Sequence, residues 1–156
     1  MGMEVEPDEL EINERIESFI IELGLPFEEV EQGLWLIHDE IDYIDNIVVY
    51  HTPPVLTFRV KLVDVKDGQV QPRLYRRLLQ LNASSMVAGA FGLEDESVVI
   101  VESLQSENLN QNEFQAAIDS IALAVREHYD DLRSVIKGDS NDDESDKEAV
   151  QAADRV

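Results

Sequence analysis

The chain has 156 residues, with 34 acidic against 12 basic side chains and a formal net charge of −22. A surface of this sign repels phosphate backbones and anionic lipids, so it disfavours binding to nucleic acid or to a membrane. The chain has no cysteine, which excludes disulfides, thiolate metal sites and cysteine nucleophiles and fits a reducing compartment. The start of the sequence lacks the pattern of a signal peptide, and every apolar run is short, so we expect a cytoplasmic protein.

The first half of the sequence predicts one helix followed by three strands. Residues 8–23 place apolar side chains at helical spacing, with Asp8 positioned to cap the helix and Gly24 to end it. The three strands are expected at residues 32–38, 46–51 and 55–65. The third alternates, and the apolar residues that share its predicted inner face are Leu56, Phe58, Val60 and Leu62.

The second half predicts a helix, two strands and a long helix. The helix runs from Pro72 to Asn82, the strands cover residues 87–93 and 97–104, and Asn110 with Glu113 forms a capping box for a helix reaching Leu132. The order α-β-β-β-α-β-β-α indicates an α+β fold: an antiparallel five-stranded sheet with helices packed mainly on one face.

The composition changes at the carboxyl end. From Gly138 onward there are seven acids, two bases and no aromatic residue, too little apolar surface to offset the entropy lost on ordering. We therefore expect a flexible N-terminus at residues 1–8, one α+β domain at 9–136 and an acidic disordered tail at 137–156.

Two surfaces are singled out by pattern. The last helix carries a second stripe of small and apolar residues, Ala116, Ser120 and Leu123, which either the chain's own sheet and first helix or a partner must cover. Six of the twelve bases lie between Arg59 and Arg77. They either pair with acids of the same chain or form a docking edge for a partner or for the acidic tail.

No motif predicts catalysis, a metal or a cofactor. His38, Asp39, Glu40 and His51 are a conceivable ligand set, but strand-end histidines without a metal explain them better. Asp139, Asn141 and Asp143 imitate the start of a calcium loop, whose glycine and final glutamate are then replaced by Glu144 and Val150. Glu102 interrupts an apolar strand and is the one acid worth testing as a catalytic group.

Two segments carry a resemblance to a known family. They are LLQLNA at residues 78–83 and GAFGLEDESVVI at residues 89–100, followed by the polar ENLNQNEF segment and the last helix. Over residues 9–132 the sequence resembles the YbjN-like proteins, which share the fold of the type III secretion chaperones of the CesT group. These motifs are structural rather than catalytic.

The resemblance implies a small, non-enzymatic, bacterial protein that forms a homodimer and holds a protein client along sheet edges and apolar grooves. Its second helix would contribute to the partner or dimer interface, which makes candidates of Leu74, Tyr75, Leu78, Arg73, Arg76 and Arg77. We expect a chaperone-like or regulatory module that captures a peptide or protein, with residues 46–51 or the next strand as docking edges. The alternative is an acidic DNA mimic or decoy that binds a basic protein.

Overall fold

The structure is a computed structural model that describes residues 7–39, 46–65, 72–86 and 88–138. The described elements, in chain order, are α1 (Pro7–Leu23), β1 (Phe27–Glu31), β2 (Leu34–Ile37), β3 (Ile47–Thr52), β4 (Val55–Asp64), α2 (Pro72–Ser84), β5 (Ala90–Glu94), β6 (Ser97–Gln105) and α3 (Gln111–Lys137). The α+β class and the antiparallel sheet are confirmed. The expected tail lies almost entirely outside the described residues.

The sheet has six strands in the order β1-β2-β3-β4-β6-β5, so the prediction of five strands is wrong. The missed strand is β1, whose sequence FEEVE is exposed at four of five positions. Its alternation is too polar to signal a half-buried strand. Gly33, with φ of 81°, supplies the left-handed turn that folds β1 back on β2.

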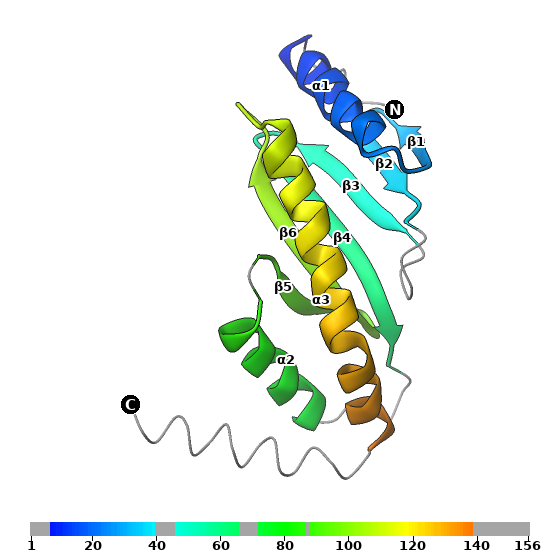
Figure 1. The fold of residues 1–156 in the computed structure, drawn as a ribbon, viewed down its shortest axis with the longest axis vertical. Coiled ribbons are helices and arrows are strands. Elements are labelled where there is room, and N and C mark those ends of the chain that lie inside the picture. The colour runs from blue at the N-terminus through cyan, green and yellow to red at the C-terminus, as the bar shows by residue number, and fades with distance from the viewer. Residues whose placement is uncertain (1–6, 40–45, 66–71, 87, 139–156) are drawn as a thin grey trace.

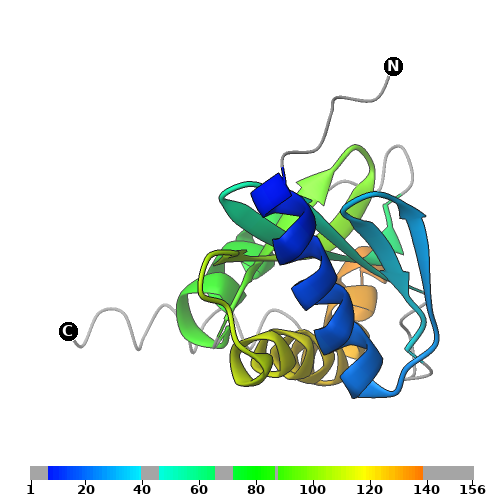
Figure 2. The ribbon, with the colours of Figure 1, turned by 90° about the horizontal axis from the view of Figure 1, so that it is seen from above.

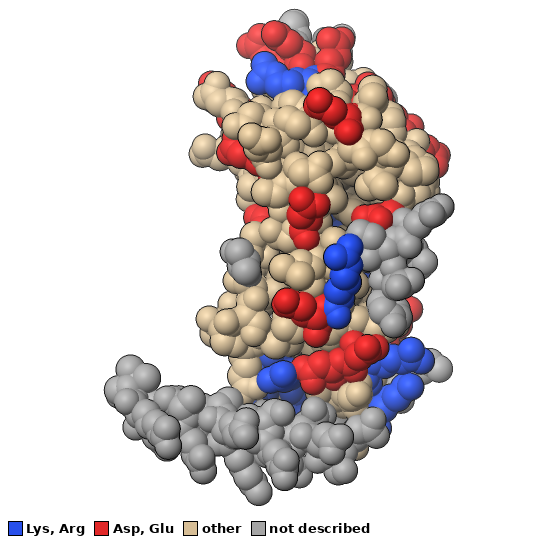
Figure 3. Space-filling model, viewed as in Figure 1, with Lys and Arg blue, Asp and Glu red and all other residues tan. Residues whose placement is uncertain are grey.

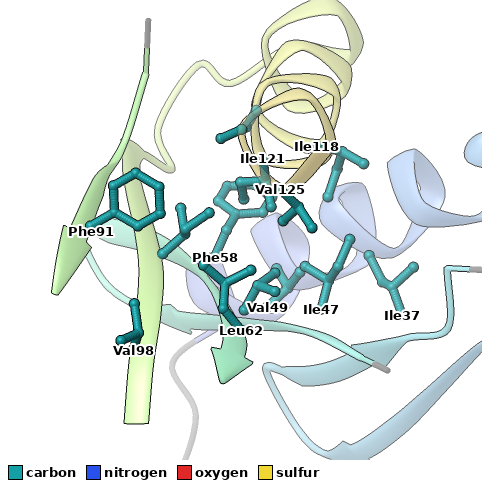
Figure 4. Packing of buried hydrophobic residues seen from close by; sticks show 14 of the residues in the cluster. Ile37, Ile47, Val49, Phe58, Leu62, Phe91, Val98, Ile118, Ile121 and Val125 are labelled. Atoms are coloured by element: carbon teal, nitrogen blue, oxygen red, sulfur yellow. The ribbon is translucent and has the colours of Figure 1, made fainter. Parts of the chain in front are cut away.

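Helices α1 and α3 cover one face of this sheet, as Figures 1 and 2 show from two directions. The predicted inner face of β4 is confirmed, because Leu56, Phe58, Val60 and Leu62 are all buried. Phe58 packs against Phe114 of α3, which in turn contacts Phe19 of α1 at ring distances of 5.3 and 5.7 Å. Figure 4 shows the aliphatic side chains of the strands meeting those of α3 around this aromatic contact.

Helix α3 begins where the sequence predicts. The Asn110 side chain accepts a hydrogen bond from the Glu113 backbone, and the Glu113 side chain reaches back to the Asn110 backbone. The helix continues beyond the predicted end at Leu132 because Val135 is also buried. It stops at Gly138, whose left-handed backbone closes the last turn. None of the described helices is long and apolar enough to cross a membrane.

Candidate protein-binding surfaces

One edge of the sheet, at β5, is closed by a side chain of α2. The Asn82 amide nitrogen donates to the Phe91 carbonyl oxygen at 3.1 Å, and its oxygen accepts from the Phe91 backbone nitrogen at 2.7 Å. Both Phe91 groups therefore point away from β6, and Asn82 satisfies them as a neighbouring strand would. The β5 edge does not offer its Phe91 groups to another chain.

The other edge, at β1, has β2 as its one strand neighbour. The Pro26 carbonyl oxygen accepts from the His38 backbone nitrogen at 2.8 Å, and hydrogen-bonded and non-bonded pairs alternate along an antiparallel ladder. The Phe27–Ile37 and Glu29–Trp35 pairs are therefore non-bonded pairs. Their β1 backbone groups point outward, and no other strand among the described residues pairs with them. The β1 edge is therefore open to the addition of a strand.

The side chains of this open edge are acidic. Glu28, Glu29 and Glu31 are exposed, and Val30 is 51% exposed beside a bulge in the β1–β2 register. Burial raises the pKa of Glu17 on α1, and the nearby carboxylates of Glu29 and Glu14 raise it further. Negative charge is thus crowded where α1 meets β1.

The docking edges expected from the sequence are wrong. Strand β3 lies between β2 and β4, and β4 lies between β3 and β6, so both strands have neighbours on each side. The long β4–β6 ladder, from Val55–Gln105 to Asp64–Ser97, pairs segments far apart in the chain. Adding a strand beside β3 or β4 would require breaking an existing ladder.

A shallow groove of about 430 Å³ runs between the end of α1 and the exposed side of α3. Leu23 and Leu25 line it from the side of α1, and Ile118, Ala122 and Leu123 line it from α3. The rest of the lining is polar or charged: Asp39, Gln115, Asp119 and Arg126. Leu123 is 45% exposed, so the chain's own described elements leave part of the second stripe of α3 uncovered. Ala116 is likewise exposed and Ser120 half-buried. Figure 3 shows broad uncharged areas between scattered acidic groups on this side of the molecule.

The predicted interface residues of α2 divide between two faces. Leu74 and Leu78 are buried in the core of the chain, at 1% and 4% exposure. Tyr75 and Arg76 lie on the exposed face, and they share it with Leu79, which is 69% exposed. Arg73 is half-buried, and Arg77 pairs with Asp131 of α3 at 2.8 Å.

The basic cluster predicted from the sequence does not form one patch. Arg59 pairs with Glu94 at 3.0 Å and lies over the Tyr50 ring, and Lys61 pairs with Asp64 at 2.8 Å. These contacts belong to the sheet, whereas the arginines at 73, 76 and 77 belong to α2. Intramolecular pairing therefore accounts for the bases on the sheet.

The two strand-end histidines of the hypothetical metal site lie in different surroundings. His51 is buried, and its Nδ1 atom lies 2.7 Å from Oδ1 of Asn13 on α1. Burial lowers the pKa of His51, and the Glu9 carboxylate only partly opposes this effect. His38 is half-buried at the end of β2, and Asp39 is buried beside it. Glu40 lies outside the described residues.

The described part of the chain contains no group of three or more His, Cys, Asp or Glu side chains able to hold a metal ion. The imitation calcium loop at Asp139, Asn141 and Asp143 falls outside it. Glu102 is half-buried on the inner side of the sheet, and one of its oxygens accepts from the Ser103 backbone nitrogen. Neither His38 nor Glu102 lines the α1–α3 groove.

The sequence profile of the CesT_Tir_1 family matches residues 9–138, so the chain belongs to this family. The Escherichia coli protein YbjN, described as a candidate transcription regulator, has a similar structure with a TM-score of 0.56. It is 18% identical, and the match covers 74% of this chain and 89% of YbjN. The predicted resemblance to the YbjN-like and CesT-like fold is confirmed.

Two solved protein complexes also contain a chain of similar structure. One is the ExoU–SpcU complex from the type III secretion system of Pseudomonas aeruginosa, at TM-score 0.57, 17% identity and coverage of 77% of this chain and 96% of that chain. The other is the HopA1–SchA chaperone–effector complex, at TM-score 0.62, 14% identity and coverage of 81% and 99%. A comparison with curated protein sequences finds no significant match. No comparison points specifically to a DNA mimic.

Proposed function

We propose that this protein is a non-enzymatic, chaperone-like module that binds a protein or peptide partner. The observation that carries the proposal is the family match over residues 9–138, which covers every described strand and α3 as well. The chaperone–effector complexes among the similar structures support the same class of partner. We expect the protein to act in the bacterial cytoplasm, as the resemblance implies.

The open β1 edge supports a partner that adds one extended strand. Such a strand would pair with the outward backbone groups of Phe27 and Glu29 and place its own side chains beside Val30. Because Glu28, Glu29 and Glu31 are exposed there, basic side chains on the partner would relieve the crowded negative charge. The α1–α3 groove offers apolar contact to another part of the same partner.

We also propose a homodimer whose contact includes the exposed face of α2. Tyr75, Arg76 and Leu79 are available for this contact. Leu74 and Leu78 hold the helix from inside, and Arg77 holds it through Asp131. Two chains of net charge −22 repel each other, so the helix with arginines and an exposed tyrosine is the least opposed surface for self-association.

The test is a selection of peptides displayed on phage against the full chain, followed by calorimetry with purified peptides. Binding peptides should be enriched in alternating apolar and basic residues. Glu29→Pro removes one outward N–H from β1 and should weaken binding about tenfold or more. Glu29→Gln keeps that N–H and should weaken binding much less.

The selection contradicts the proposal if no peptide binds at micromolar concentration. Strand addition at β1 fails if Glu29→Pro and Glu29→Gln bind equally well. Light scattering on the unliganded protein tests the dimer separately, with Leu79→Glu expected to shift it to monomer because a charge would replace an apolar contact.

A further inference from the structure

Helix α2 is basic in an otherwise acidic protein. Its sequence contains three arginines and no acid. By contrast, α1 carries six acids and one base, and α3 carries five acids and three lysine or arginine residues. The exposed Arg76, with Tyr75 and Leu79 on the same face, therefore forms a local positive surface.

This positive surface lies beside the point where the described chain ends. The Arg77–Asp131 pair fastens α2 to α3, and Lys137 ends α3 six residues later, about 9 Å further along the helix axis. Figure 1 shows the beginning of α2 next to the last turns of α3, and Figure 3 shows Lys and Arg side chains at this end on either side of a band of acidic side chains.

The sequence that follows Gly138 has the complementary charge. Its first eight residues, DSNDDESD, contain five acids and no base. Eight extended residues reach about 28 Å, whereas the 13 residues of α2 span about 20 Å. From its attachment at Gly138, the acidic block is therefore long enough to reach Arg76, the exposed arginine of α2, whereas Arg77 is already paired with Asp131.

We propose that residues 139–146 bind in cis to the basic face of α2 and cover Tyr75, Arg76 and Leu79. Tethering keeps the acidic block at an effective concentration of about millimolar. Because single exposed ion pairs are weak, several of its five acids must act together on this face. The bound block competes with any second copy or client for the α2 face. This inference goes beyond the proposed function, and the mixed-chain experiment below distinguishes tail binding from contact with a second copy.

The experiment measures where the tail lies in the full-length chain. Because the sequence has no cysteine, Ser145→Cys accepts a single nitroxide spin label. Amide signals in an isotope-labelled sample then report proximity by paramagnetic broadening. At about 0.05 M salt we expect selective broadening of α2, several-fold weaker at about 0.5 M salt because screening shortens the reach of the charges.

Matched variants separate specific contact from general charge. Neutralising Asp139, Asp142, Asp143, Glu144 and Asp146 to their amides should abolish the broadening, while neutralising Glu28, Glu29 and Glu31 should not. Arg76→Gln should weaken it several-fold, while Arg126→Gln on the exposed side of α3 should leave it unchanged.

Three results would overturn the proposal. One is absence of selective broadening at α2, and another is broadening that ignores both salt and the acid-to-amide changes. The third is equal broadening when spin-labelled chains are mixed with separate isotope-labelled chains, which would assign the contact to a second copy. Unchanged melting temperatures confirm that the variants remain folded.

Discussion

The two edges of the sheet differ in how the outward backbone N–H and C=O groups of their edge strands are satisfied. At β5, the outward groups of Phe91 are satisfied by the side chain of Asn82. At β1, exposed carboxylates surround the outward backbone groups of Phe27 and Glu29, and no strand among the described residues lies on that side. An unpaired edge attracts any strand, and acidic side chains restrict which strand it accepts. The difference supports our proposal that the β1 edge binds a partner, whereas the β5 edge contributes to the stability of the fold.

The largest expected effect comes from the glycines that precede the two edge strands. Gly89 and Gly24 have nearly equal φ values of 74° and 73°. A Cβ atom at Gly89 would lie 2.9 Å from the Val101 carbonyl oxygen, whereas one at Gly24 meets nothing within 4 Å. We expect Gly89→Ala to destabilise the fold by about 2–4 kcal/mol and Gly24→Ala by about 1 kcal/mol.

Urea unfolding of both alanine variants measures this difference. Since the backbone strain is matched, the excess at Gly89 reports the close packing of β5 against β6. Equal losses of stability would mean that the backbone around Gly89 shifts easily to accept the added methyl group. The interpretation that β5 is packed rigidly against β6 would then be wrong.

Removal of the Asn82 side chain should convert the closed edge into an open one. Asn82→Ala leaves both Phe91 backbone groups without their partner, so we expect a loss of about 1–3 kcal/mol. The newly open edge should also self-associate at high protein concentration, detected by light scattering. Ser84→Ala is the control because the exposed Ser84 hydroxyl donates a hydrogen bond to the Gln80 carbonyl oxygen within α2 rather than to β5. If Asn82→Ala has the same association state as the unaltered chain, α2 closes β5 by some other means.

The sequence predicts α3 and the core strands well because their signals are local. The Asn110 capping box and the apolar ladder of α3 identify a helix without any knowledge of its neighbours. The alternation in β4 identifies its buried face in the same way. Family motifs around residues 78–100 then identify the fold, and the profile match over residues 9–138 confirms it.

The proposed binding edge could not be predicted in this way because it depends on strand order. Placing β6 between β4 and β5 requires a pairing between distant segments. By contrast, β3 lies inside the sheet because it pairs with β2 and β4, its neighbours in sequence. β1 was missed because its exposed glutamates hide the strand pattern, although Pro26 before it and Gly33 after it bound a hairpin-sized segment. Asn82 appeared only as a helix end, since its bond to Phe91 is visible only in three dimensions.

Acid should loosen the packing of α1 beside the open edge. His51 is buried against Asn13, and burial lowers its pKa. The unfolded chain takes up a proton near the usual value of about 6.5, whereas native His51 resists it. Stability from this group is complete above that value and declines as the pH falls toward the lowered native pKa. Urea unfolding from about pH 7 to about pH 5 should show this decline, which His51→Gln should reduce. Parallel curves for the two proteins would contradict it.

The smallest expected effect tests whether local repulsion between carboxylates destabilises the protein where α1 meets β1. Burial and the carboxylates of Glu29 and Glu14 raise the pKa of Glu17, so Glu17 holds its proton more tightly in the native state than in the unfolded state. Its contribution to stability is therefore complete below the usual pKa and is lost as the pH rises through the raised native value.

Glu17→Gln should be more stable by a few tenths of a kcal/mol at neutral pH, and this gain should vanish in acid. Glu22→Gln, an exposed position on α1, removes the same charge away from Glu29 and should gain less. If both variants gain equally, the repulsion comes from net charge alone. A basic strand would then have no special advantage at β1, and its selectivity would have to come from shape.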